Sequence, residues 1–264
     1  MSMANAKGRL YLLPNLLDPG VAPEACMPGR ALEAFRRLRH FVAESDRSAW
    51  RLLSRFLDKE ALEGVSLGRL DEHSDPASLS ALLAPAEAGN DLGLMSDAGI
   101  PCVADPGGAL VALAHDRGVE VVPAGGPSSI LLALSASGLD GQRFSFLGYL
   151  PQERERRRAA LAEIDRGVRS DGATRIFIET PYRNAALLDD CVSVLSPQVR
   201  LCVAASLTAP GERIRSAASR EWKAGGWRPG KEAAIFLVGR VPGLGIDDSA
   251  RTGHRERECK NRKR

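Results

Sequence analysis

The stretch that decides the fold is GLMSDAGIPCVADPGGALVALAHDRGVEVVPAGGPSSILLALSASG, residues 93–138. Its glycines, prolines and serines lie at the ends of short apolar segments and not inside them. Small residues where a strand gives way to a helix let the backbone approach a ligand closely and leave amides free to bind it. Ligands of open α/β sheets usually bind outside the carboxyl ends of the strands. The stretch therefore predicts two strand–loop–helix passages, each of which offers amides to a ligand.

Short apolar runs alternate with helical patterns through most of the chain, which is the rhythm of βαβ units. The rhythm restarts after Gly138, so we expect two α/β domains, residues 1–125 and 126–240, followed by a basic, disordered tail over 241–264. We expect strands at residues 9–13, 41–44, 92–96, 119–122, 144–148, 174–179, 199–205 and 233–239, and helices at 108–117, 128–137, 153–168 and 183–195.

Two further helix starts are marked by capping residues. Asp46 is placed to cap a helix whose apolar positions recur at helical spacing, namely Trp50, Leu53, Phe56 and Leu57. Asp75 and Pro76 begin another, because proline in the first turn of a helix gives up no hydrogen bond.

The charge of the chain is concentrated at one end. The 264 residues are 44% hydrophobic, enough for a substantial core, and the formal net charge is +3. Residues 251–264 hold seven Lys/Arg and two Asp/Glu, which leaves 29 basic against 31 acidic residues elsewhere, or −2. Such a tail is either a solvated end or an electrostatic arm for nucleic acid.

Several classes of protein are disfavoured. No apolar run approaches the roughly 18 residues that cross a bilayer, and the first residues lack a secretory signal, so we expect a soluble, cytoplasmic protein without a membrane partner. The five cysteines are scattered without a CxxC pair, and the four histidines show no HxxxH or HExxH spacing. We therefore expect reduced thiols and no metal site.

Two nucleotide-binding motifs are missing. GxGxxG is absent, which argues against the usual dinucleotide-binding fold. Residues 225–232, GGWRPGKE, match the Walker A spacing as far as the lysine. Glutamate then stands where Ser or Thr must hold magnesium, and a strand-like AAIFLV follows where a helix is required, so we reject a phosphate loop.

Four segments, MSDAGIPCVADPG, VVPAGGPSSILLALSASGL, FSFLGYLP and FIETPYRN, resemble the tetrapyrrole-methylase superfamily of S-adenosylmethionine-dependent methyltransferases. Within it the chain resembles the ribosomal RNA small subunit methyltransferase I branch, because residues 43–47, AESDR, are similar to that branch's AEDTR. The resemblance runs in order from about residue 10 to 239. It implies two α/β domains with the cofactor in the cleft between them, and a homodimer.

The resemblance also assigns residues to the site. It implies that S-adenosylmethionine is contacted by the first loop, the SDAGI segment, the serines after the Gly-Gly-Pro turn and the end of a second-domain strand: Pro14, Ser96, Asp97, Ala98, Gly99, Ile100, Ser128, Ser129, Glu179 and Thr180. His73, in a DEHS segment, joins Arg47 and Arg183 as substrate-binding candidates. The guanidinium forks suit backbone phosphate, and fixing the domain interface is the alternative role of the two arginines.

Two segments depart from the branch. Residues 14–20 read PNLLDPG where the branch reads like TPIGNL, so a glycine that lets substrate approach is displaced. Residues 207–210 read LTAP where the branch commonly has LTK, which removes a lysine able to touch RNA.

Methyl transfer from a sulfonium is an in-line displacement that depends on alignment and a dry pocket. Where the acceptor is a ribose hydroxyl, a carboxylate that takes its proton helps, and Glu44, Asp97 and Glu179 are candidates near the ends of predicted strands. Their alternative role is to cap helices or pair with arginines. The leading hypothesis is ribose 2′-O-methylation of small-subunit ribosomal RNA. A tetrapyrrole or other small acceptor, and a non-catalytic cofactor-binding module, remain alternatives.

Overall fold

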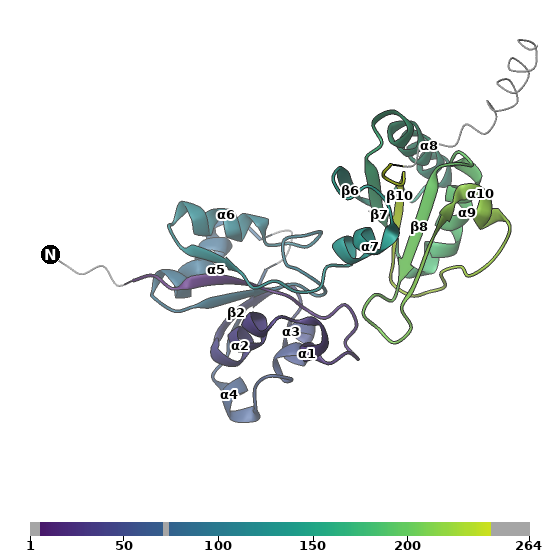
Figure 1. The fold of residues 1–264 in the computed structure, drawn as a ribbon. Helices are drawn as coiled ribbons and strands as arrows, with labels where there is room; N and C mark the ends of the chain where they lie inside the picture. Colours follow the sequence, from purple (N-terminus) through teal and green to yellow (C-terminus); the bar gives the residue numbers. More distant parts are fainter. Residues whose placement is uncertain (1–5, 71–73, 244–264) are drawn as a thin grey trace, which may run out of the picture. The chain divides into compact units, whose positions relative to one another are not determined.

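The structure, a computed structural model, describes residues 6–70 and 74–243. It divides into two compact units, Met1–Ser129 and Ile130–Arg264. Each unit has its own sheet and its own hydrophobic core (Figure 1). His73 and residues 244–264, which hold most of the basic tail expected from the sequence, lie outside the described residues.

The first unit is built on a parallel sheet of five strands. The strands are β1 (Arg9–Leu13), β2 (His40–Ala43), β3 (Ser66–Arg69), β4 (Leu92–Met95) and β5 (Glu120–Pro123). Their order in the sheet is β3-β2-β4-β1-β5, and every pairing is parallel. All carboxyl ends therefore meet at one edge, and the expected α/β fold is confirmed.

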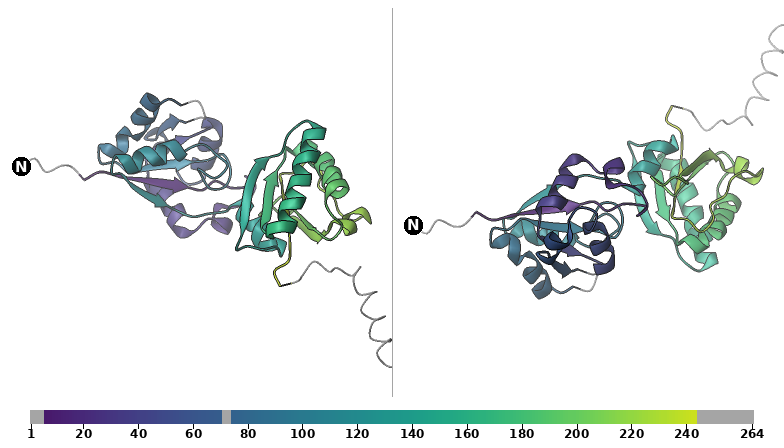
Figure 2. Two further views of the ribbon diagram at one scale, coloured as in Figure 1. Left: turned by 90° about the horizontal axis from the view of Figure 1, so that it is seen from above. Right: turned by 90° about the horizontal axis from the view of Figure 1, so that it is seen from below.

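Helices cover both faces of this sheet (Figure 2). On one face lie α1 (Pro23–Cys26), α2 (Gly29–Arg37), α3 (Asp46–Leu53) and α4 (Lys59–Glu63), and on the other lie α5 (Pro76–Glu87) and α6 (Gly108–Asp116). Phe35 of α2 stacks on Phe56 with 4.6 Å between ring centroids. Because the sheet is covered twice, all four residues of β4 are buried.

Helix α3 begins differently from the expectation. Ser45, not Asp46, is the N-cap, and its side chain accepts a hydrogen bond from Ser48 N at 3.3 Å. Asp46 is the first helical residue, where its charge still favours the helix dipole. Trp50, expected on the apolar face, is 38% exposed, because the buried face consists of Ser48, Ala49, Leu52 and Leu53.

The second unit contains a mixed sheet. Its strands are β6 (Phe144–Tyr149), β7 (Thr174–Ile178), β8 (Arg200–Ala205), β9 (Arg213–Ala218) and β10 (Ala234–Gly239), in the order β6-β7-β10-β8-β9. Among these five strands, β6 and β7 pair in parallel and the other pairings are antiparallel. The helices are α7 (Ser129–Ser137), α8 (Arg154–Asp171), a 3-10 turn (Pro181–Arg183), α9 (Asn184–Val194) and α10 (Ser219–Lys223).

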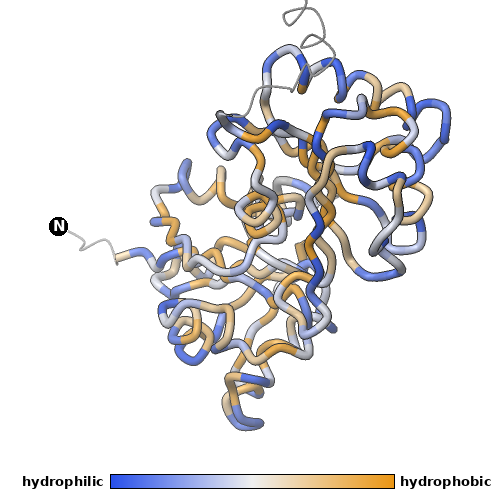
Figure 3. Tube along the Cα trace, turned by 45° about the vertical axis from the view of Figure 1, so that its right-hand side comes forward, coloured by the Kyte–Doolittle hydropathy of each residue, from blue (hydrophilic) through white to orange (hydrophobic). Residues whose placement is uncertain are grey.

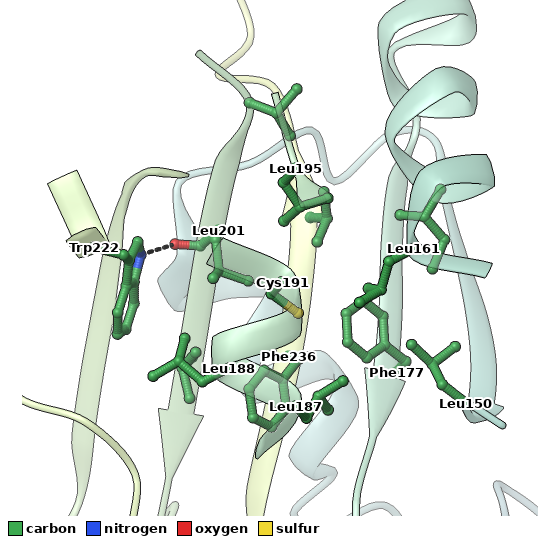
Figure 4. Packing of buried hydrophobic residues seen from close by; sticks show 14 of the residues in the cluster. Leu150, Leu161, Phe177, Leu187, Leu188, Cys191, Leu195, Leu201, Trp222 and Phe236 are labelled. Atoms are coloured by element: carbon green, nitrogen blue, oxygen red, sulfur yellow. Dashed lines mark hydrogen bonds between the residues drawn. The ribbon is translucent and has the colours of Figure 1, made fainter. Parts of the chain in front are cut away.

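The core of the second unit lies between this sheet and the helices α8 to α10 (Figure 4). Phe177 and Phe236 stack with 5.9 Å between centroids, and Trp222 Nε1 donates to Leu201 O at 3.0 Å. Apolar and polar segments alternate along the chain in each unit (Figure 3).

A buried ion pair joins α8 to α9. Arg157 donates to Asp190 through Nη2 at 2.7 Å and Nε at 2.9 Å, and Arg154 and Arg158 also donate to this carboxylate. Asp190 is 1% exposed and Arg157 5%. The charged helix expected at 153–168 is thus held to its neighbour by charge as well as by apolar contacts.

Candidate functional site

The predicted residues of the first unit gather at the carboxyl edge of its sheet. Pro14 follows β1, Glu44 follows β2 and residues 96–100 follow β4, and these three strands are neighbours in the order β2-β4-β1. Ser128 lies in the loop after β5, on the other side of β1. The fold therefore brings together segments that the sequence holds far apart. Glu179, Thr180 and Arg183 follow β7 in the second unit.

Asn15 ties these loops together, and its role was not predicted. Its backbone exchanges two hydrogen bonds with Gly99, at 2.7 and 3.1 Å. Its side-chain Nδ2 donates to Ser96 O at 2.9 Å and to Ser48 Oγ at 3.2 Å, although Asn15 is only 6% exposed. One amide thus fixes the loop after β1, the loop after β4 and helix α3. The signal available in the sequence was a polar residue two positions after the end of the strand β1.

Glycine permits the closest approach between two of the loops. A Cβ atom added to Gly126 would lie 2.2 Å from Pro14 Cβ, and the φ of Gly126 is +153°. Gly99 has φ +77°, with Pro127 O 3.5 Å from the place of its missing Cβ. Pro14 is buried against the turn that contains Gly126. Asp97 and Ala98, in the loop after β4, are exposed.

A cavity of about 540 Å³ opens beside the same edge. Glu44, Leu70, Ser74 and Leu79 line it together with residues 104–109. Asp105, half-buried in its wall, is not among the carboxylates predicted from the sequence. Burial, and then the charges of Glu44 and Asp97, raise the pKa of Asp105 to about 6. Two of the predicted carboxylates, Glu44 and Asp97, thus help to raise the pKa of a third.

Glu179, the remaining carboxylate candidate, is engaged by its neighbours. Its Oε1 accepts from Thr180 N at 2.7 Å and from Arg183 Nη2 at 2.5 Å, and its side chain is 1% exposed. The hydrogen bond to Glu179 raises the pKa of Arg183. This pairing within the second unit matches the alternative role of the candidate carboxylates, which is to pair with an arginine. Glu179 Oε2 is buried and has no partner within residues 6–70 and 74–243.

The other predicted residues are placed as follows. Ser96 is buried, and its hydroxyl donates to Gly99 O at 3.1 Å, inside the loop. Ser129 is the first residue of α7, and Arg47 is exposed on α3. Within the described part of the chain, no group of three or more His, Cys, Asp or Glu could hold a metal ion, and no helix is long and apolar enough to cross a membrane.

Comparison with known proteins gives consistent results. The family described as Tetrapyrrole (Corrin/Porphyrin) Methylases matches residues 27–221. The ribosomal RNA small subunit methyltransferase I of Escherichia coli O157:H7 is 34% identical over 82% of this chain and 71% of its own length. The protein of that name from Pseudomonas aeruginosa is 33% identical over 79% and 72%. Among solved structures, the methyltransferase CobJ has a similar fold, with a TM-score of 0.57 and 19% identity over 90% of this chain and 98% of its own.

Proposed function

The chain belongs to the tetrapyrrole methylase family and is an S-adenosylmethionine-dependent methyltransferase, and we propose that its methyl acceptor is RNA of the small ribosomal subunit. The observation that carries the proposal is the 34% identity, over 82% of the chain, to a relative named ribosomal RNA small subunit methyltransferase I. The acceptor atom that we propose is a ribose 2′-oxygen.

The residues present fit S-adenosylmethionine. The loops after β4 and β5 offer small side chains and left-handed glycines, so that backbone groups can reach a ligand. In the second unit, Glu179 Oε2 is a buried acceptor that lacks a donor, and the cofactor carries an ammonium group, hydroxyls and an adenine amine. We propose that the exposed Asp97 and Ala98, with Gly99, Ile100, Ser128, Ser129, Glu179 and Thr180, hold the cofactor, and that Pro14 and Ser96 support these loops from within.

The bound cofactor supplies a methyl group on a positively charged sulfur. In the transfer the carbon–sulfur bond breaks, a carbon–oxygen bond forms and the hydroxyl loses its proton. Asp105 is the acceptor that we propose for this proton, because a carboxyl with a pKa of about 6 is a stronger base than an ordinary aspartate and is still ionised at pH 7. Glu44, on the same cavity, keeps that pKa raised through its charge. The negative charge of Glu179 is balanced by Arg183, so we assign Glu179 to positioning the cofactor and not to accepting the proton.

The test is transfer of labelled methyl from S-adenosylmethionine to small ribosomal subunits isolated from cells that lack this enzyme. We expect label in the RNA, and we expect Asp105→Asn to lower the rate about 100-fold. Asp116→Asn, an exposed change on helix α6, serves as the matched control and leaves the rate unchanged. Absence of label from RNA despite measurable cofactor binding would overturn the proposal, and methylation of a porphyrinoid in its place would establish the tetrapyrrole alternative.

We also propose that the protein is a cytoplasmic homodimer, as its resemblance to the superfamily implies. Sedimentation equilibrium of the full chain is expected to give twice the chain mass of 28.3 kDa. A mass of one chain at micromolar concentration would contradict the dimer without touching the proposed reaction.

A further inference from the structure

Helix α3 presents an exposed row of cations with an aromatic ring among them. Arg47 and Arg51 are exposed and one helical turn apart, and Trp50 lies beside Arg51 with 38% of its surface exposed. Part of the Trp50 side chain is therefore accessible on the same helix as the two arginines. We call Arg47, Trp50 and Arg51 the α3 stripe.

Within the described part of the chain, the arginines of the stripe are not held in ion pairs. Neither Arg47 nor Arg51 forms an ion pair with a carboxylate within residues 6–70 and 74–243, although Arg9, Arg37 and Arg117 of the same unit do. The described part of this unit carries 12 Lys/Arg against 15 Asp/Glu, so the unit as a whole does not attract a polyanion. A phosphate chain would therefore be drawn to the local cluster of unpaired arginines.

The stripe adjoins the candidate site at both of its ends. Glu44, which lines the large cavity, precedes α3 in the chain and is separated from Arg47 by two residues. Arg51 lines a hollow of about 70 Å³ with Asn15, Asp97 and Ala98. Arg55, at the next turn, donates to Pro19 O at 2.9 Å and Val21 O at 2.8 Å and so fixes the loop after β1. A strand lying along the stripe would enter the loops where methyl transfer is proposed.

We propose that the α3 stripe binds a single-stranded segment of the RNA substrate, with Arg47 and Arg51 on successive backbone phosphates and Trp50 stacked on a base. Alternation of guanidinium groups with an aromatic face is the chemistry that holds single-stranded RNA, because phosphates take the charge and an unstacked base takes the ring. This inference rests on the proposed function and adds the surface that positions the acceptor nucleotide.

The experiment measures methyl transfer to purified small subunits as a function of subunit concentration and salt. Trp50→Ala is expected to raise the KM for subunits roughly 5- to 100-fold. Trp50→Phe keeps an aromatic face, so its KM should lie much closer to that of the wild type. Arg47→Ala and Arg51→Ala should each reduce the slope of log affinity against log salt by about 0.7. Arg30→Ala, an exposed arginine on α2, is the matched control and leaves both quantities unchanged.

Calorimetric binding of S-adenosylmethionine separates the stripe from a folding defect, since every variant should bind the cofactor as the wild type does. If the wild type methylates subunits but the stripe variants keep its KM and salt slope, the inference is wrong and the proposed function stands. If the wild type transfers no methyl to RNA, the proposed function is wrong, and the inference that rests on it is wrong with it. A stripe variant that loses cofactor binding would contradict a role confined to RNA.

Discussion

Replacing Asp105 by asparagine should make the protein more stable at neutral pH while making it a poorer enzyme. The carboxyl is half-buried in the wall of a cavity that Glu44 also lines, and Asp97 contributes a second like charge. Its ionised form is therefore unfavourable in the folded state. Asparagine keeps the size and polarity of the side chain but carries no charge at any pH.

The magnitude follows from the pKa of Asp105, which rises from 3.8 in the unfolded chain to about 6 in the folded one. Below pH 4 both states hold the proton and the carboxyl has no effect. Between about pH 4 and 6 the unfolded state releases its proton and the folded state does not, so the free energy of unfolding falls as pH rises. A pKa difference of about 2 corresponds to about 3 kcal/mol. Because the carboxyl is only partly buried, solvent screening reduces the expected loss to about 1 to 2 kcal/mol.

The assay is urea unfolding of wild type and Asp105→Asn at pH 4.5, 6 and 8, followed by far-ultraviolet circular dichroism. Between pH 4.5 and pH 8 the stability advantage of the variant should widen by about 0.7 to 1.3 kcal/mol, because part of the effect is already present at pH 4.5. Asp116→Asn should shift stability by no more than about 0.5 kcal/mol at any pH. An advantage that stays constant, or that narrows as pH rises, would refute the reasoning about the carboxylate cluster.

Three further changes test the loops and the second unit. The Cβ of Gly126→Ala would lie 2.2 Å from Pro14 Cβ, so this variant should bind S-adenosylmethionine at least about tenfold more weakly by calorimetry. The Cβ of Gly141→Ala meets nothing within 4 Å, so this control should bind the cofactor as the wild type does. Equal affinities of the two variants would contradict the close approach of Gly126 to Pro14. Asn15→Ala leaves buried backbone groups unpaired and should cost about 2 kcal/mol by chemical unfolding, and an unchanged midpoint would show that the amide is dispensable. Burial raises the pKa of Asp190, but hydrogen bonds from Arg157 and Arg154 outweigh this effect and hold the pKa below its usual value. Asp190→Asn should therefore lower the free energy of unfolding by about 3 kcal/mol at pH 7 and by progressively less below pH 4. Chemical unfolding at several pH values measures this trend, and a cost that does not change with pH would contradict it.

The sequence predicts the strands that contain an apolar run, including the edge strands β5 and β6, and misses the edge strands β3 and β9. β4 and β10, all of whose residues are buried, lie within a residue or two of the predicted ranges. β3, SLGR, and β9, RIRSAA, each occupy an edge and carry arginines with few β-branched residues, so they have no apolar run to recognise. Trp50 shows the opposite error, because helical spacing alone cannot tell a core tryptophan from an exposed one.

At the candidate site, the sequence predicts which loops are involved but not what each side chain does. The order of Gly, Pro and Ser after the strands places the loops correctly, because backbone geometry dictates those residue types. The raised pKa of Asp105 depends first on its burial and then on the charge of Glu44, which is far from it in sequence. The hydrogen bond from Asn15 to Ser96 is likewise a product of packing between loops that lie far apart in the sequence. Glu179 and Arg183 are only four residues apart, and their pairing is the alternative role that the sequence allowed for this carboxylate.

The measurement that tests the central claim most directly is mass spectrometry of nucleosides from small subunits methylated by this protein with isotopically labelled S-adenosylmethionine. The account predicts a labelled 2′-O-methylnucleoside, formed at a rate that Asp105→Asn lowers about 100-fold. A labelled methyl group on a base, or no labelled nucleoside from a protein that binds the cofactor, would contradict it.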